Sequence, residues 1–313
     1  MGSVTPLRLP TIDFSKENLK PGTIFWDSVR KDVRRALEEF GCFEAVFDEV
    51  SIELHNAFFH ELEELFDLPL ETKLQNTNSD LPGYGYIGQL PFQPLYEGMG
   101  IDDAPIREGT QSFTNLMWPD GNFRFCESVH SFSKRVSKLD QMVKRMVFES
   151  LGIQKYYDPL IESTNYLVRV MKYRVPKANE TKLAVPRHTD KSLLSILHQN
   201  HVNGLEVQTW DGEWISVAPS ASSFVVMTGE AVLAWSNGRL HCPKHRVTMS
   251  VKETRYSTGL FSFSKEIVQT PEELVDEEHP LLYKPFDHMG FLRFSGTDEG
   301  KKAESVLKAY CGV

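Results

Sequence analysis

The change in apolar periodicity near residue 165 constrains the fold more than any other feature of this sequence. Before it, apolar residues recur at the three- and four-residue spacing of amphipathic helices over 26–40, 51–67 and 128–151. After it, the apolar runs are short and are separated by Gly, Pro, Asn and Asp, which is typical of strands and turns. We therefore expect a β-rich unit with helices packed against it.

Several short segments after this change have the apolar, β-branched composition of strands. They are 165–173, 183–190, 193–198, 204–208, 223–227, 232–236, 244–248 and 256–263. Such a series of short strands favours a double-stranded β-helix, or jelly roll. Segment 271–309 returns to a helical pattern, with Pro271 suited to a first helical turn, and is expected to close one end of the barrel. The predicted class is mainly β with flanking helices.

Composition restricts the class of partner. Acidic residues outnumber basic ones and the net charge is -9, which argues against binding to nucleic acid or to an anionic membrane. The cysteines are widely separated, so the sequence predicts neither a Cys-x-x-Cys zinc site nor a dithiol centre. The first residues lack the apolar run of a signal peptide, and no stretch is apolar enough to span a bilayer. We expect a cytoplasmic, monomeric protein whose partner is a small molecule.

A histidine and an aspartate one residue apart, His188 and Asp190, lie in one predicted strand, and His245 lies in a later one. Residues at i and i+2 of a strand point to the same face, so the first two can chelate one ion. Two imidazoles and one carboxylate on one face of Fe(II) leave the other positions for a bidentate co-substrate and dioxygen. A His-x-Asp pair alone is weak evidence, because both residue types are common at caps and turns.

A second pair with the same spacing, Arg255 and Ser257, follows ten residues after His245. On a strand it would place a guanidinium and a hydroxyl side by side, facing inward. Arginine binds carboxylates in a bidentate manner and keeps its charge, so this pair suits the distal carboxylate of a dicarboxylic keto acid. Tyr173 is expected to add a third hydrogen bond. The second pair therefore strengthens the prediction of an iron site.

With these motifs, the chain resembles the plant 2-oxoglutarate- and Fe(II)-dependent dioxygenases over nearly its whole length. The resemblance rests on His188-x-Asp190, on Asn237-Gly238-Arg239-Leu240 leading to His245-Arg246-Val247, on Arg255-x-Ser257, and on the N-terminal segments Leu9-Pro10-Thr11-Ile12-Asp13-Phe14 and Phe66-Asp67-Leu68-Pro69. Within that family the chain is most similar to the AOP-like branch, the alkenyl- and hydroxyalkyl-producing dioxygenases. Met171-Lys172-Tyr173, His188-Thr189-Asp190-Lys191 and the segment from Arg255 to Phe261 carry this closer similarity.

Two positions depart from the pattern of the broader family. Many relatives have Asn where Met171 stands and Pro where Lys191 stands. Neither change removes a metal ligand. Met171 cannot make the hydrogen bonds of an Asn side chain, so the contact that this Asn makes in relatives is in question here.

The resemblance implies two regions and a set of site residues. Region 1–120 would be the N-terminal region of helices and strands, and 121–313 the Fe(II)/2-oxoglutarate-dependent double-stranded β-helix domain with C-terminal helices. The resemblance also implies that His188, Asp190 and His245 bind Fe(II) and act in catalysis, and that Arg255, Ser257 and Tyr173 bind 2-oxoglutarate.

The implied activity is oxidation, by default hydroxylation, of a C–H bond in a plant specialised metabolite. Succinate and carbon dioxide would be the co-products, and ascorbate an optional reductant. Desaturation, demethylation and ring closure begin with the same hydrogen abstraction and stay open as alternatives. Two further alternatives are an oxidase that uses ascorbate instead of 2-oxoglutarate, and a non-catalytic barrel that binds a small molecule.

Region 81–125 is rich in Gly, Pro and aromatic residues, and we interpret it as the wall on the substrate side of the pocket. A structured loop without a ligand is the alternative. The candidate substrate contacts in this region are Tyr84, Tyr86, Phe92 and Phe113. Aromatic residues at these positions suit a partly apolar substrate.

Two further residues are candidates for substrate contact. Arg169 shares a strand face with Met171 and Tyr173, so its guanidinium is expected inside the barrel. An interior guanidinium must be paired, either with a carboxylate of the protein or with a polar group of the substrate. Phe261 has the same strand parity as Arg255, and either lines the pocket or belongs to the ordinary barrel core.

Overall fold

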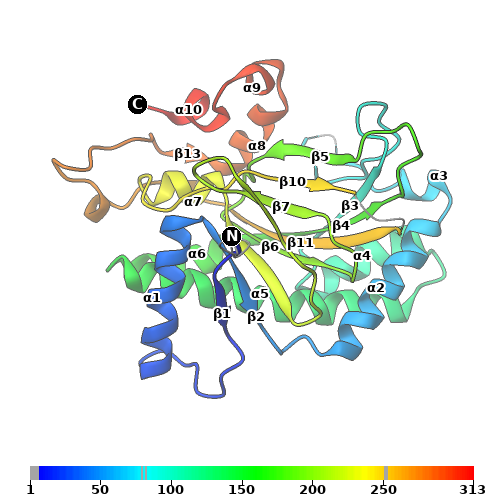
Figure 1. Ribbon diagram of the computed structural model, residues 1–313, viewed down its shortest axis with the longest axis horizontal. Coiled ribbons are helices and arrows are strands. Elements are labelled where there is room, and N and C mark those ends of the chain that lie inside the picture. Colours follow the sequence, from blue (N-terminus) through cyan, green and yellow to red (C-terminus); the bar gives the residue numbers. More distant parts are fainter. Residues whose placement is uncertain (1–6, 79, 82, 250–252) are drawn as a thin grey trace, which may run out of the picture.

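Two sheets packed face to face form the centre of the molecule (Figure 1). The computed structural model describes residues 7–78, 80, 81, 83–249 and 253–313. The larger sheet has the order β1 (Thr11–Asp13), β2 (Cys42–Val46), β9 (Ser223–Thr228), β6 (Leu194–Gln199), β11 (Arg255–Ser264), β4 (Thr164–Tyr173), β3 (Tyr96–Asp102). The smaller sheet has the order β5 (Leu183–His188), β10 (His245–Thr248), β7 (Leu205–Gln208), β8 (Trp214–Ser216). This arrangement confirms the predicted jelly roll.

The longest helix, α5 (Phe123–Ser150), covers the outer face of the larger sheet, with α1 (Ile24–Glu39) and α2 (Ile52–Asp67) packed against it (Figure 1). Asp140 of α5 accepts a hydrogen bond from Ser262 of β11 at 2.9 Å. Each of the three helices begins at a side-chain cap, since the residue before its first turn accepts a hydrogen bond from a backbone N–H. The helices predicted at these places are confirmed.

The prediction of a strand at 232–236 is wrong. It belongs to α7 (Glu230–Trp235), which begins after Gly229. A short apolar run does not distinguish a strand from a buried helix by periodicity alone, and the two alanines of α7, Ala231 and Ala234, favour the helix. Trp235 therefore lies on a helix, and its ring stacks on that of Phe148 with the ring centroids 4.4 Å apart.

Region 81–125 contains regular elements that the sequence did not predict. They are strand β3 and helix α4 (Arg107–Met117). Two glycines, Gly98 and Gly100, give β3 a low intrinsic strand propensity, and its pairing with β4 from Tyr96 to Asp102 holds it in the sheet. Only part of this region is therefore loop.

The C-terminal part returns to short helices, as predicted, and reaches the barrel. It contains β12 (Ile267–Val268), a 3-10 turn (Glu272–Leu274), β13 (Phe286–Asp287), α8 (His288–Gly296), α9 (Asp298–Lys302) and α10 (Val306–Cys311). The remaining short helices are α3 (Leu70–Lys73), a 3-10 turn (Gln154–Tyr156) and α6 (Tyr157–Ser163). Helix α8 packs on β11, and Leu292 and Ser295 of this helix line the cavity between the sheets.

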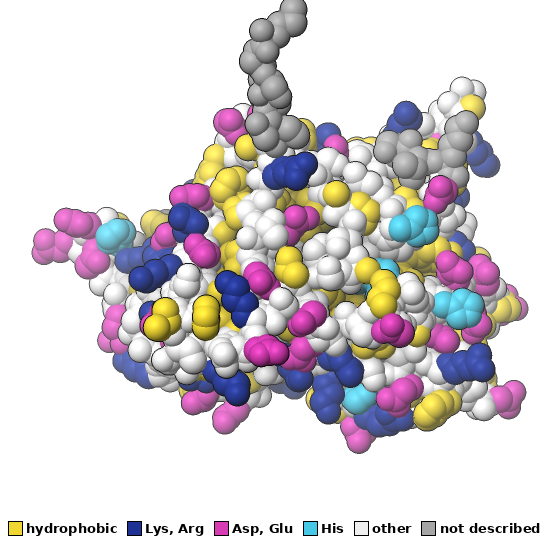
Figure 2. Space-filling model, turned by 60° about the horizontal axis from the view of Figure 1, so that its bottom comes forward, with side chains coloured by type: hydrophobic (Ala, Val, Ile, Leu, Met, Phe, Trp, Pro, Cys, Tyr) yellow, Lys and Arg dark blue, Asp and Glu magenta, His cyan; other side chains and the backbone are white. Residues whose placement is uncertain are grey.

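The surface carries both signs of charge. On the face drawn in Figure 2, acidic and basic side chains are interspersed with apolar ones. No helix in the described part of the chain has both the length and the apolar character needed to cross a bilayer.

Candidate active site

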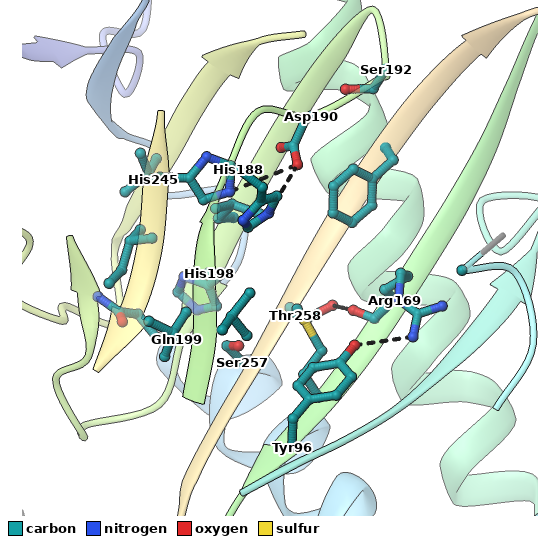
Figure 3. Close-up of a pocket in the computed structure, with 18 of the residues that line it drawn as sticks. Tyr96, Arg169, His188, Asp190, Ser192, His198, Gln199, His245, Ser257 and Thr258 are labelled. Carbon is teal, nitrogen blue, oxygen red and sulfur yellow. Dashed lines mark hydrogen bonds and ion pairs between the residues drawn. The ribbon is translucent and has the colours of Figure 1, made fainter. Parts of the chain in front are cut away.

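A cavity of about 380 Å³ lies between the inner faces of the two sheets (Figure 3). The larger sheet contributes residues from β4, β6 and β11, and the smaller sheet contributes residues from β5, β7 and β10. The antiparallel register of β11 and β4 places Arg255 opposite Tyr173, Ser257 opposite Met171, and Gly259 opposite Arg169. Side chains at alternate positions of these two strands therefore point into one space.

His188, Asp190 and His245 meet at one end of this cavity (Figure 3). The strand pair β5–β10 places His188 directly opposite His245, with their ring centroids 4.2 Å apart. Oδ1 of Asp190 lies 3.6 Å from Nε2 of His188 and 3.7 Å from Nε2 of His245. One ligand atom from each of the three side chains lies within 4.8 Å of the others, which is a spacing suited to a metal ion.

The protonation states suit metal ligands. Nδ1 of His188 lies 2.9 Å from the carbonyl oxygen of Pro186, and donation to this oxygen leaves the lone pair of Nε2 free. Burial, with the neighbouring His188, lowers the pKa of His245 to about 4, so this imidazole is neutral at physiological pH. Burial acts to raise the pKa of Asp190, but the two histidines outweigh it and the pKa lies below its usual value.

The donor set fits Fe(II). Oδ2 of Asp190 is buried and has no hydrogen-bond partner among the described residues, a costly arrangement that a bound cation would relieve. Two neutral imidazoles and one carboxylate are the ligands that non-haem Fe(II) sites use, and no thiolate lies among them to favour zinc.

The backbone that carries Asp190 is held from outside the cavity. Glu230 of α7 donates its backbone N–H to the carbonyl oxygen of Asp190 at 2.8 Å, and its carboxylate accepts a hydrogen bond from Thr189. The same carboxylate accepts a hydrogen bond from Nζ of Lys191 at 2.7 Å. Lys191, where relatives have Pro, is thus tied to α7.

Arg255 is buried and is surrounded by groups that fix its guanidinium. Nη1 donates to Oγ of Ser257 at 3.1 Å, and Nη2 donates to Oε1 of Gln199 at 2.8 Å. The guanidinium lies 4.7 Å from the ring centroid of Tyr173, in a cation–π arrangement. Nε of Arg255 has no hydrogen-bond partner among the described residues. A buried cation with hydrogen-bonding capacity to spare suits a carboxylate ligand.

Gln199 was not predicted from the sequence. It lies on β6 directly opposite Ser257 of β11, and its Nε2 donates to the carbonyl oxygen of Val217 at 3.1 Å. Its position next to Arg255 depends on the pairing of two distant strands, for which the sequence carries no local signal.

The structure separates the predicted substrate residues into two groups. Tyr84, Arg169 and Phe261 line the cavity. The other three, Tyr86, Phe92 and Phe113, lie outside it, which corrects the prediction. Tyr86 donates to Glu97 at 3.0 Å, Phe92 is 78% exposed, and Phe113 packs in the core on Phe125. Aromatic composition alone does not show which side chains point inward.

Comparisons with known proteins agree with this geometry. A family model described as the 2OG-Fe(II) oxygenase superfamily matches residues 153–264, and one described as the non-haem dioxygenase in morphine synthesis N-terminal matches residues 9–111. The probable 2-oxoglutarate-dependent dioxygenase AOP1.2 of Arabidopsis thaliana is 50% identical over 97% of this chain and 95% of its own length. The 2-oxoglutarate-dependent dioxygenase AOP3 of the same plant is 33% identical over 100% of this chain and 99% of its own length.

Solved structures show the same fold. The rice dioxygenase for auxin oxidation superposes with a TM-score of 0.79 at 30% identity, covering 97% of this chain and 100% of its own. The Arabidopsis thaliana dioxygenase for auxin oxidation, in its complex with 2-oxoglutarate, gives a TM-score of 0.78 at 29% identity, covering 87% of this chain and 99% of its own.

Proposed function

This chain belongs to the AOP-type 2-oxoglutarate-dependent dioxygenases, and we propose that it hydroxylates a C–H bond of a small, partly apolar plant metabolite. It is an oxidoreductase that uses Fe(II) and 2-oxoglutarate. Succinate and carbon dioxide are the proposed co-products. The convergence of His188, Asp190 and His245 in the cavity that also holds Arg255 is the observation that carries the proposal.

In this proposal His188, Asp190 and His245 hold the iron. When bound there, Fe(II) supplies the activation of dioxygen that leads to abstraction of a substrate hydrogen. The chain lowers the pKa of His245 and that of Asp190, which favours a neutral imidazole beside an ionised carboxylate. Glu230 fixes the segment that carries the carboxylate of Asp190.

Arg255 and Ser257 bind the distal carboxylate of 2-oxoglutarate, with the ring of Tyr173 beneath the guanidinium. Gln199 orients the guanidinium from the far side. The buried Nε of Arg255, for which the described residues offer no acceptor, supports this assignment, because it leaves a donor for the incoming carboxylate.

The substrate occupies the apolar part of the cavity. Tyr84, Leu167, Phe261, Phe263 and Leu292 line it there. These side chains exclude water and orient an apolar body, which limits the hydrogens that come within reach of the metal.

We extend the proposal to the setting of the enzyme. All ligating and co-substrate residues come from one chain, which supports function as a monomer. The four cysteines are free thiols and are buried, which supports the reducing cytoplasm. Light scattering of the purified enzyme and fractionation of tagged enzyme in cells test these two points.

The first test is anaerobic titration of the Fe(II)-loaded protein with 2-oxoglutarate, followed by visible absorption. The wild type should develop the weak charge-transfer band of a chelated keto acid. Arg255→Gln should lose the band at the same co-substrate concentration, whereas Arg35→Gln, a charge-matched change at an exposed arginine of α1, should keep it. Bound iron without a band would favour the ascorbate-type oxidase, and absence of iron binding would favour the non-catalytic barrel.

Product mass then tests the type of oxidation. Hydroxylation adds one oxygen to the substrate. Loss of two hydrogens would assign desaturation instead, and loss of a methyl group would assign demethylation. Succinate released in proportion to substrate consumed would establish the coupling.

A further inference from the structure

Arg169 is a buried arginine inside the cavity that forms no ion pair with any residue that the structure describes. Its side chain projects from β4, and the residue is 8% exposed. Nη1 donates to the carbonyl oxygen of Gly85 at 3.3 Å, and Nη2 donates to the hydroxyl of Tyr96 at 3.0 Å (Figure 3). Both acceptors are neutral, and among the described residues no carboxylate forms an ion pair with this guanidinium.

This arrangement is unusual for a buried cation. Charged groups are almost never buried unless an opposite charge accompanies them, because the loss of hydration is costly. The same protein satisfies this rule elsewhere: the buried Nζ of Lys144 lies 2.8 Å from the carboxylate of Asp140. Within the described part of the chain Arg169 therefore lacks an anion, and its side chain lines the cavity.

Glycines lie beside Arg169 on both neighbouring strands. Its cross-strand neighbours on the two sides are Gly100 of β3 and Gly259 of β11. A Cβ atom at Gly98 would lie 2.9 Å from Nη2 of Arg169 and would also collide with the ring of Tyr96. Because Gly98 has no side chain, the guanidinium of Arg169 can extend over β3 to the hydroxyl of Tyr96.

The position of Arg169 separates it from the co-substrate site. Gln199 and Ser257 mark the region of Arg255, and Arg169 lies across the cavity from them (Figure 3). Phe261, on β11, has an inward-facing side chain that also lines the cavity. Of the other charged side chains that line the cavity, Arg255 is assigned to 2-oxoglutarate, Asp190 to the metal, and Lys191 is paired with Glu230. Arg169 is the cation left without an anionic partner.

We propose that Arg169 and Tyr96 bind a carboxylate of the prime substrate, so that the substrate is an organic acid with an apolar body. The proposal rests on the function proposed above and adds the chemical class of the substrate. Arg169 supplies the charge and two directed N–H groups, and Tyr96 holds the guanidinium toward β3. The apolar body lies against Phe261, Leu167 and Tyr84, between the carboxylate and the metal ligands.

A matched pair of probes tests the charge requirement. Hydrocinnamate and hydrocinnamide share an aromatic body and differ in the carboxylate. Each is titrated calorimetrically into the anaerobic Fe(II) enzyme saturated with 2-oxoglutarate, so that Arg255 is already occupied. Hydrocinnamate should bind, and the amide should bind roughly tenfold to a hundredfold more weakly, as expected for loss of hydrogen bonds to a charged group.

Variants assign the effect to Arg169. Arg169→Gln should weaken hydrocinnamate binding to the level of the amide and leave amide binding unchanged, and Arg169→Lys should fall between them. Arg35→Gln is the charge-matched control and should bind as the wild type does. Three results would each overturn the proposed carboxylate subsite. They are equal binding of the two probes, undiminished binding of the acid by Arg169→Gln, and no binding of the acid at tens of millimolar.

Two further readouts separate this proposal from its alternatives. If the 2-oxoglutarate band forms in the wild type and in Arg169→Gln, failure of the acid to bind overturns the subsite alone, whereas absence of the band in the wild type overturns the proposed function. The ligand-free stability of Arg169→Met tests a structural role. A binding arginine should be replaceable without loss of thermal stability, and a clear fall in Tm would assign the residue to the scaffold instead.

Discussion

Nη2 of Arg255 donates a hydrogen bond to Oε1 of Gln199 at 2.8 Å, so the guanidinium is oriented before any co-substrate arrives. The amide of Gln199 is itself fixed, because its Nε2 donates to the carbonyl oxygen of Val217. Gln199 therefore contributes through orientation and leaves the positive charge of Arg255 uncompensated. A carboxylate at this position would instead neutralise the charge.

Substitutions at Gln199 separate these two effects. Gln199→Leu should weaken 2-oxoglutarate binding roughly three- to tenfold, on the order of the net contribution of one hydrogen bond, because the guanidinium would lose its orientation. Gln199→Glu should weaken it by more than this, because its carboxylate would compete with that of the co-substrate for Arg255. Anaerobic titration of the charge-transfer band measures both constants. Tighter binding by the Glu variant would contradict the assignment of Arg255.

Asp190 is the anionic member of the candidate metal site. Loss of a residue that only hydrogen-bonds to a metal ligand lowers metal affinity by about 10- to 100-fold. Asp190→Ala removes a ligand itself, so it should lower the affinity for Fe(II) by more than this. Iron content after equilibrium dialysis measures the loss directly, and turnover should vanish with it. Asp32→Ala, at an exposed carboxylate of α1, is the matched control. Full iron retention by Asp190→Ala would remove Asp190 from the ligand set.

Strand parity explains why much of the site was predictable. Arg255 and Ser257 are an i, i+2 pair within β11, and the period of a strand places both on one face. The same local rule placed Arg169 on the inner face with Tyr173. These predictions needed only the correct assignment of strands. His188 is the last residue of β5, and Asp190 lies in the loop after it, so the predicted strand 183–190 was two residues too long.

Features that depend on non-local pairing were not predictable. Gln199 reaches Arg255 because β6 and β11 pair in one register, and β3 is a strand because β4 lies beside it. The helix that contains Trp235 was missed because its six residues, five of them apolar, are too few to reveal a period. The absence of an ion pair at Arg169 likewise needed the positions of all nearby carboxylates.

Lys144 and Asp140 form a buried ion pair within α5, and Asp140 also links this helix to the larger sheet. Asp140 also accepts hydrogen bonds from Tyr166 and Ser262, both at 2.9 Å. Asp140→Asn should therefore destabilise the protein by about 3–5 kcal/mol, since the Lys144 charge would stay buried without its partner. Urea denaturation measures the change. Glu49→Gln breaks an exposed ion pair with Lys138 and should lower the unfolding free energy much less. Equal losses for the two variants would show that the buried pair stabilises the protein no more than an exposed one.

His288 couples α8 to the loop that carries the metal ligand Asp190. Its Nδ1 accepts a hydrogen bond from the backbone N–H of Ser264 at 3.1 Å, and its Nε2 donates to the carbonyl oxygen of Lys191 at 2.7 Å. The bond that Nδ1 accepts requires the neutral imidazole, because protonation would turn this nitrogen into a donor. Burial lowers the pKa of His288 to about 4, well below its usual value of about 6.5.

Because the pKa of His288 is depressed in the folded state, the unfolded chain binds a proton first as the pH falls. The stability that His288 contributes is present above about pH 6.5 and is lost progressively as the pH falls toward about 4. Between about pH 7 and pH 5 this loss amounts to about 2 kcal/mol of unfolding free energy.

His288→Gln should lack this part of the pH dependence, so its stability should fall less steeply than that of the wild type over the same interval. Urea denaturation at the two pH values measures both slopes, with His60→Gln as the exposed control. Parallel slopes for wild type and His288→Gln would mean that the imidazole takes up its proton without cost in the folded state, contrary to its hydrogen bonds.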